Sequence, residues 1–288
     1  MFNGRLIRVA VALLSLISLL MLTAGMAAAQ DKTVRIAYVE WDDATASTNM
    51  VKAALEEMGY EVEILSVAAA AMWQAVGTGN VDAMVAAWLP MTHEDYYAQV
   101  KDNVHDLGPI ATGARLGWVV PSYVTIDSIA ELNDHADRFG GRVVGIDPGA
   151  GLMRLSEEVI QKYDLTNMEL LEGSDATMTA ALGNAINRDE WIVVTGWSPH
   201  WKFGVWDLKY LDDPKGALGG EEQIHAIARD GLQEDMPEVY AFLSNFSWAN
   251  ADQLQKVMAW NQEPGSDPLE NAKRFLREHP EELERWKP

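Results

Sequence analysis

The chain contains two copies of the same order of predicted elements, and this repeat constrains the fold more than any other feature. The first copy opens at Val34 and the second at Arg142, 108 residues later. Trp88 and Trp197 lie 109 residues apart, and each ends an apolar strand-like run two residues before a proline. Both copies have the order strand, helix, strand, helix, strand. Two such runs predict two similar α/β lobes, each a β-sheet flanked by helices.

The first long helix of each copy is predicted from the spacing of its apolar residues. In the first copy the apolar positions are Val51, Ala54, Leu55 and Met58. Ser47 and Thr48 precede them as candidate N-caps, and Gly59 follows them as a stop signal. In the second copy the apolar positions are Leu152, Leu155, Val159 and Ile160.

Segments outside the copies predict how the lobes are joined. Residues 115–124 (RLGWVVPSYV) have the composition of a strand that crosses from one lobe to the other. We expect residues 30–120 together with 215–288 to form the first lobe and residues 121–214 the second, with a ligand cleft between them. The C-terminal part is expected to be helical. Its apolar residues at helical spacing are Val239, Phe242, Leu243, Phe246, Leu254, Val257 and Met258.

The N-terminus has the pattern of a signal peptide. Arg5 and Arg8 precede an apolar run over residues 9–22, and small residues follow up to Ala29. This pattern predicts cleavage after Ala29 and export to the periplasm, whereas a permanent N-terminal anchor is the alternative. No cysteine stands at the cleavage point to accept a lipid, so we expect a free protein that is not embedded in the membrane.

The charge of the chain excludes one large class of partner. Twenty-two Lys and Arg stand against 43 Asp and Glu, which gives a formal net charge of −21. Such a chain repels phosphate backbones, so we expect no nucleic-acid binding. The chain also lacks cysteine, so its stability depends on an apolar core and not on disulfides.

Three tryptophans stand where a ligand would be bound. Trp41, Trp88 and Trp197 each follow or end a predicted strand, and open α/β sheets bind ligands outside the carboxyl ends of their strands. One such tryptophan is usually packing, but three at equivalent places favour an aromatic cage. A quaternary ammonium has a fixed charge and no conventional hydrogen-bond donor, so proteins hold it against aromatic faces worth about 0.5–2 kcal/mol each. Trp201 is a candidate support for this cage.

A zwitterion would also need donors for its carboxylate. The turn Gly149-Ala150-Gly151 leads from a strand into the helix that begins near Leu152. Free backbone N–H groups at such a helix start bind anions. His93, five residues after Trp88, offers a candidate side-chain donor.

Several segments together resemble one family, the glycine betaine-binding proteins of osmoprotectant ABC importers (OpuAC type). They are AYVEWDDATASTN, MWQAVGTGNVDAMVAAWLPMTH, GIDPGAGLM, VVTGWSPHWKF and LKYLDDPKG. The resemblance implies a two-lobed periplasmic binding protein fold, type II-like, without cofactor or metal. It implies a monomer that passes a quaternary-ammonium zwitterion to a membrane permease. It places the cage on Trp41, Trp88 and Trp197 and the carboxylate anchors on His93, Gly151 and Leu152.

One departure from the family and several alternatives stay open at this point. Some family members carry the two halves in the opposite order, which resembles a circular permutation. Choline, proline betaine or dimethylsulfoniopropionate would satisfy the same cage as glycine betaine. A hydrolase could use Glu40, Asp42 and Asp43, but we expect acids so close together to be solvated on an exposed turn. A metal site is not indicated, because no two histidines are spaced i, i+4 and cysteine is absent.

Overall fold

The structure is a computed structural model that describes residues 32–288. The predicted signal peptide therefore lies outside the described residues. Residues Val34–Pro288 form one compact unit.

The strands of this unit form one continuous sheet. Its order is β2-β1-β3-β9-β4-β7-β5-β6, and β8 pairs with β4 off this path. The strands are β1 (Thr33–Tyr38), β2 (Glu61–Ser66), β3 (Ala83–Leu89), β4 (Val104–Pro121), β5 (Arg142–Val144), β6 (Glu169–Leu171), β7 (Val193–Ser198), β8 (Leu208–Tyr210) and β9 (Glu221–Arg229). Parallel pairing joins β1 to β3 and joins β5 to both β6 and β7, whereas the pairs that involve β4 and β9 are antiparallel.

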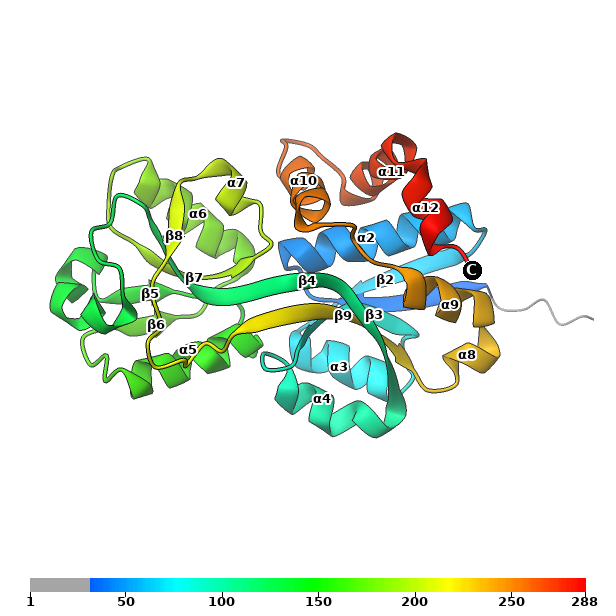
Figure 1. Cartoon of the computed structure of the whole chain (residues 1–288), viewed down its shortest axis with the longest axis horizontal. Helices are drawn as coiled ribbons and strands as arrows, with labels where there is room; N and C mark the ends of the chain where they lie inside the picture. The colour runs from blue at the N-terminus through cyan, green and yellow to red at the C-terminus, as the bar shows by residue number, and fades with distance from the viewer. Residues whose placement is uncertain (1–31) are drawn as a thin grey trace, which may run out of the picture. The chain divides into compact units, whose positions relative to one another are not determined.

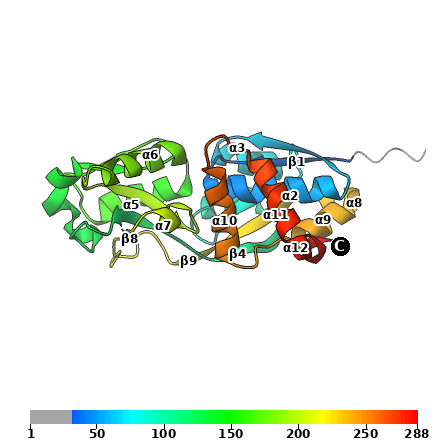
Figure 2. The same cartoon turned by 90° about the horizontal axis from the view of Figure 1, so that it is seen from above.

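Helices lie on both faces of this sheet (Figures 1 and 2). They are α2 (Asp42–Glu57), α3 (Ala69–Gly77), α4 (Glu94–Val100), η1 (Lys101–Asn103), η2 (Ile129–Phe139), α5 (Gly151–Lys162), α6 (Asp175–Ile186), α7 (Lys202–Val205), α8 (Leu232–Asp235), α9 (Pro237–Asn245), α10 (Ala251–Asn261), α11 (Pro268–Glu278) and α12 (Pro280–Trp286). Helices α10 and α11 pack along α2.

The long strand β4 runs through two lobes, as Figure 1 shows. Its residues from Val104 to Arg115 pair with β9, and those from Arg115 to Val119 pair with β7. We name the half with β1 to β3, α2 to α4 and α8 to α12 the first lobe, and the half with η2, β5 to β8 and α5 to α7 the second lobe. The two-lobed α/β prediction is confirmed, and the predicted crossing strand is the second half of β4. The residue boundaries of the lobes stay a prediction.

The start of α2 differs from the prediction. The helix begins at Asp42, so Ser47 and Thr48 are buried inside it and are not its caps. The prediction of a local cap was wrong because the first backbone N–H of α2 donates to Asp175, which lies 133 residues further along the chain. Gly59 follows the end of α2 with φ +89°, as a helix stop signal should.

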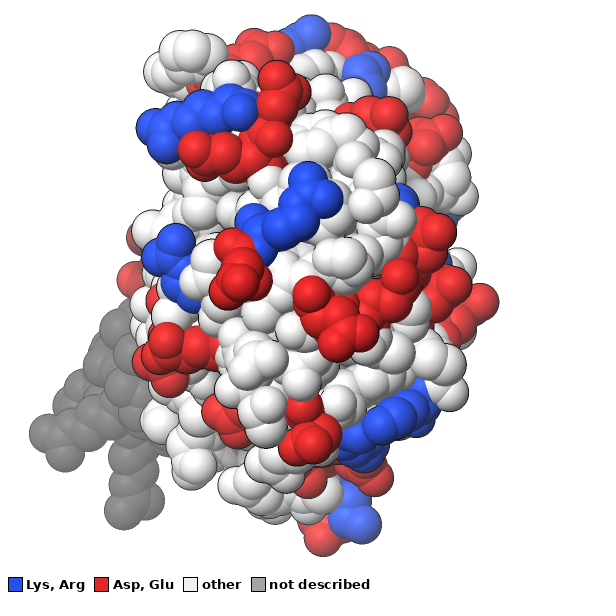
Figure 3. All heavy atoms as spheres, turned by 90° about the vertical axis from the view of Figure 1, so that its left-hand side faces the viewer, with Lys and Arg blue, Asp and Glu red and all other residues white. Residues whose placement is uncertain are grey.

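The predicted apolar stripes of the C-terminal helices form core. Val239, Phe242, Leu243, Phe246, Leu254, Val257 and Met258 are all buried. None of the helices within residues 32–288 combines the length and apolarity needed to cross a lipid bilayer. Figure 3, which faces the second lobe, shows acidic side chains over much of the surface with Lys and Arg scattered among them and no basic patch.

Candidate functional site

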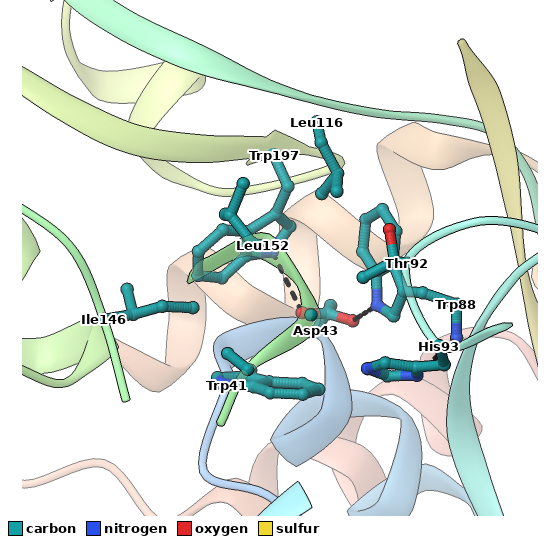
Figure 4. A pocket seen from close by; sticks show the side chains of 11 residues that line it. Trp41, Asp43, Trp88, Thr92, His93, Leu116, Ile146, Leu152 and Trp197 are labelled. Carbon is teal, nitrogen blue, oxygen red and sulfur yellow. Dashed lines mark hydrogen bonds between the residues drawn. The ribbon is translucent and has the colours of Figure 1, made fainter. Parts of the chain in front are cut away.

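The six residues predicted from sequence surround one pocket. The empty space that these residues border is about 280 Å³, the open mouth of the pocket included. It is lined by Trp41, Asp43, Trp88, Thr92, His93, Leu116, Ile146, Ala150, Gly151, Leu152 and Trp197. Figure 4 shows the three indoles on different sides of this space. The first lobe supplies two of the indoles and the histidine, while the second lobe supplies the third indole and the start of α5.

A single carboxylate fixes two of the indoles. Asp43 Oδ1 accepts the Nε1–H of Trp197 at 3.0 Å, and Asp43 Oδ2 accepts the Nε1–H of Trp88 at 3.3 Å (Figure 4). The third indole, Trp41, donates its Nε1–H to Asp147 Oδ2 at 3.2 Å. Because carboxylates accept the N–H groups of the three indoles, the rings are fixed and can present a face to a ligand in the pocket.

Asp43 corrects one expectation from the sequence. We expected it on a solvated turn, but it lies in the first turn of α2 and is only 1% exposed. Burial, together with the charge of Asp175, raises the pKa of Asp43 to about 7, while its two indole hydrogen bonds oppose this rise. Two adjacent acids at the start of a helix carry no sequence signal for this role, and only the nearby Trp41 marked the segment.

The buried His93 presents one hydrogen-bond donor to the pocket. Its Nδ1 accepts the backbone N–H of Trp88 at 3.0 Å, so the neutral ring carries its proton on Nε2. Within the described residues this Nε2 has no partner. Burial, and to a lesser extent the charge of Arg154, lowers the pKa of His93 to about 3, so the ring is neutral at physiological pH. Trp41 stacks on it at 5.7 Å between ring centroids, and Trp73 contacts it edge-on at 5.8 Å.

The start of α5 presents two further donors. No side chain caps this helix among the described residues. The N–H groups of Met153 and Arg154 both donate to the carbonyl of Ala150, at 3.0 and 3.2 Å. The first N–H groups of a helix have no partner inside it, so those of Gly151 and Leu152 remain for an acceptor in the pocket.

The two lobes touch at the rim of the pocket. A Cβ on Gly151 would lie 2.1 Å from the carbonyl oxygen of Thr92, so only glycine permits this approach. Tyr96 donates its hydroxyl to the carbonyl of Gly149 at 2.7 Å, and Arg154 Nη2 donates to the carbonyl of Met91 at 3.3 Å. The lobes are therefore closed over the pocket.

Further charged groups lie buried behind Trp197. The Lys202 ammonium is 4.3 Å from the centroid of the Trp197 ring, and within the described residues it has no hydrogen-bond partner. Burial lowers the pKa of Lys202 to about 8, against the opposing charges of Asp175, Asp42 and Asp43. Trp201, the candidate support, donates its Nε1–H to the carboxylate of Asp42 and not to a residue of the pocket.

Asp42, Asp175 and His200 bring three potential metal-ligand atoms within 4.8 Å of one another. The histidine spacing in the sequence did not indicate this cluster, because three separate segments form it. His200 Nδ1 accepts the backbone N–H of Lys202 at 3.2 Å, so its Nε2 carries the proton and donates to Asp175 Oδ1 at 3.1 Å. The neutral His200 thus gives Asp175 a hydrogen bond, and the buried ammonium of Lys202 is the positive charge that interacts with both carboxylates.

Comparison with known families agrees with this geometry. Residues 32–278 match the family described as the substrate-binding domain of ABC-type glycine betaine transport systems, OpuAC. The chain belongs to this family. The resemblance seen in the sequence motifs is thereby confirmed. The OpuAC family consists of binding domains of transport systems, which supports the expectation of a binding protein over an enzyme.

Individual proteins resemble this chain over different lengths. The glycine betaine/carnitine transport binding protein GbuC of Listeria monocytogenes is 41% identical over 155 residues, which are 53% of this chain and 51% of the Listeria protein. The matched region thus spans about half of that relative. Lactococcal OpuAC, in its closed-liganded conformation with glycine betaine, superposes with a TM-score of 0.84 and 41% identity over 90% of this chain and 100% of that chain. A choline-binding protein in complex with choline gives a TM-score of 0.83 and 26% identity over 89% and 91%.

Proposed function

We propose that this chain is the substrate-binding component of an ABC importer that takes up glycine betaine or proline betaine for osmoprotection. Trp41, Trp88 and Trp197 enclose the quaternary ammonium, and His93 with the amides of Gly151 and Leu152 binds the carboxylate. The protein works in the periplasm as a monomer and delivers its ligand to the membrane permease. Membership of the OpuAC family supports the transport role, and the ligands named for similar proteins support the ligand class.

The observation that carries the proposal is the unpartnered Nε2–H of His93 in a pocket walled by indoles. A buried donor without an acceptor costs about 1–3 kcal/mol, so such a group requires a partner in the working complex. A carboxylate accepts from His93 and from the two amides of α5 at once. The trimethylammonium end needs no hydrogen bond and gains from aromatic faces. A zwitterion of this type satisfies both halves of the pocket.

The mechanism follows from the division of the site between the lobes. Neither lobe alone offers both an aromatic enclosure and all of the carboxylate donors. The ligand therefore binds the closed arrangement more tightly than an open one, and it shifts the population toward closure. The permease then has a closed form to recognise, which distinguishes loaded from empty protein.

Choline or another quaternary-ammonium or sulfonium solute is the second candidate. Asp43 lines the pocket and adds a carboxylate that favours a ligand with net positive charge. A similar protein of known structure binds choline. Against this candidate, both Asp43 oxygens already accept indole N–H groups, and a hydroxyl offers the His93 and α5 donors a weaker acceptor than a carboxylate does.

Calorimetric titration of the protein without residues 1–29 tests the proposal directly. The ligands are glycine betaine, proline betaine, choline and glycine. We expect the two betaines to bind, choline to bind at least about ten-fold more weakly, and glycine not to bind, because its ammonium would lose hydrogen bonds on entering the indole-lined space. Tighter binding of choline would favour the second candidate. Absence of heat with all three quaternary ligands would contradict the proposal.

A further inference from the structure

The N-terminus of α2 receives its cap from the opposite lobe. Trp41 stands at the N-cap position and makes no side-chain capping bond. Instead, the backbone N–H of Asp42 donates to Asp175 Oδ2 at 3.0 Å. Asp175 is the first residue of α6 in the second lobe. A carboxylate at this position satisfies one of the orphan N–H groups of α2 and interacts favourably with the helix dipole.

The carboxylate of Asp175 is held in place for this contact. Its side chain is 3% exposed, and its Oδ1 accepts the Nε2–H of His200 at 3.1 Å. The α6 helix has its own local cap, because Ser174 Oγ accepts the backbone N–H of Thr177 at 3.2 Å. Asp175 is therefore not needed to cap its own helix, and its second oxygen serves α2 across the cleft.

The first turn of α2 is the part of the first lobe that organises the pocket. It is preceded by Trp41 and contains Asp43, whose carboxylate holds the indoles of Trp88 and Trp197. Fraying of this turn would move the carboxylate away from the two indole N–H groups that it holds. The contact from Asp175 exists only when the lobes are together, because the two residues belong to different lobes.

We propose that Asp175 is a positioning residue that caps α2 across the cleft and so couples closure of the lobes to assembly of the tryptophan cage. This inference rests on the proposed function, since it explains how the cage becomes rigid when the ligand binds. In the open form the turn that carries Asp43 lacks its cap and is loosely held. On closure the cap forms, and the ring orientations become fixed around the ligand.

Two variants separate this role from an ordinary structural one. Asp175→Ala removes the cap that α2 receives from the other lobe. Ser174→Ala, one residue earlier in the chain, removes the local cap of α6. For Asp175→Ala we expect an affinity for glycine betaine lower by about ten-fold, which corresponds to about 1.4 kcal/mol. We also expect a lower melting temperature, because His200 and the buried ammonium of Lys202 lose an acidic partner. For Ser174→Ala we expect a lower melting temperature as well, but nearly unchanged affinity, so affinity separates the two roles.

Amide hydrogen exchange over residues 42–45 supplies the specific readout. Glycine betaine should increase protection of these amides in the wild type and in Ser174→Ala, but not in Asp175→Ala. Asp175→Asn keeps an oxygen that caps helices well, so it should restore most of the protection and affinity.

Three outcomes would overturn the inference or its premise. Equal affinity and equal ligand-induced protection in Asp175→Ala and wild type would contradict the positioning role. If Asp175→Ala fails to fold because His200 and Lys202 lose their acidic partner, Asp175→Asn supplies the test, and loss of affinity and of ligand-induced protection in that variant would contradict the positioning role. A wild-type protein that binds none of the quaternary ligands would instead contradict the proposed function.

Discussion

Asp43 Oδ1 accepts the indole N–H of Trp197 at 3.0 Å across 154 residues of sequence. The other oxygen of the same carboxylate accepts the indole N–H of Trp88. One buried acid from the first lobe thus orients an aromatic ring from each lobe. This bridge, the donors opposite it and the contact of the lobes at Gly151 together shape the pocket.

Removal of an indole face should weaken binding of the quaternary ammonium. For Trp197→Ala we expect affinity for glycine betaine to fall by about ten-fold or more, equal to about 1.4 kcal/mol or more, as measured by calorimetric titration. Trp191→Ala is the matched control, because Trp191 lies in the same lobe and packs against Phe139 and Arg138 away from the pocket. Unchanged affinity in Trp197→Ala would remove this ring from the proposed cage.

His93 should distinguish a zwitterion from a plain cation. His93→Asn keeps an acceptor near Nδ1 for the backbone N–H of Trp88 but removes the Nε2–H donor. A hydrogen bond to a charged group contributes about 1.5–3 kcal/mol, so affinity for glycine betaine should fall by about ten-fold or more. Affinity for choline should change little. An equal loss for both ligands would mean that His93 supports the rings and does not bind the carboxylate.

Gly151 should control closure. Gly151→Ala places a methyl group 2.1 Å from the carbonyl of Thr92, so the second lobe must move away from the first. We expect weaker binding and a smaller ligand-induced decrease of the radius of gyration in small-angle scattering. Gly204→Ala is the control, because a Cβ there meets no atom within 4 Å. Full compaction of Gly151→Ala on ligand addition would contradict the closed geometry.

Binding should release protons below neutral pH. The pKa of Asp43 is raised to about 7, and a cation beside it stabilises the ionised carboxylate and lowers that pKa. Affinity should therefore rise as the pH rises from about 5 to 7. Asp42 and Asp175, with pKa values of about 6, titrate in the same window. Burial lowers the pKa of His93 to about 3 and lowers that of His200 well below its ordinary value.

Calorimetry at pH 6 in two buffers of different ionisation enthalpy measures the proton release. Asp43→Asn removes the titrating group next to the rings, so most of the dependence of affinity on pH should disappear. Identical apparent enthalpies in the two buffers for the wild type would contradict this linkage.

The stability of the protein without ligand should depend on pH in the opposite direction. The raised pKa values of Asp42, Asp43 and Asp175 mean that the folded chain binds more protons than the unfolded chain between about pH 4 and 7. The free energy of unfolding should therefore fall as the pH rises through this range.

The sequence by itself determined the α/β class, the repeat and six of the residues that line the pocket. Trp41, Trp88 and Trp197 could be found because each follows or ends a strand, and strand ends in open α/β sheets meet at one crevice. Gly151 and Leu152 could be found because a glycine turn before a helix leaves backbone donors free. These inferences succeed because they depend on local pattern and on rules of topology.

Only the tertiary structure decided how these residues are held. Asp43 looked like a solvated acid, and Ser47 looked like a helix cap. Asp43 instead accepts the indole N–H of Trp197, and Ser47 accepts that of Trp248, partners that lie more than a hundred residues away in the chain. Hydrogen bonds between side chains have a range of about 3 Å and no fixed separation in sequence, so no local pattern encodes their partners. Packing of the two lobes selects these partners.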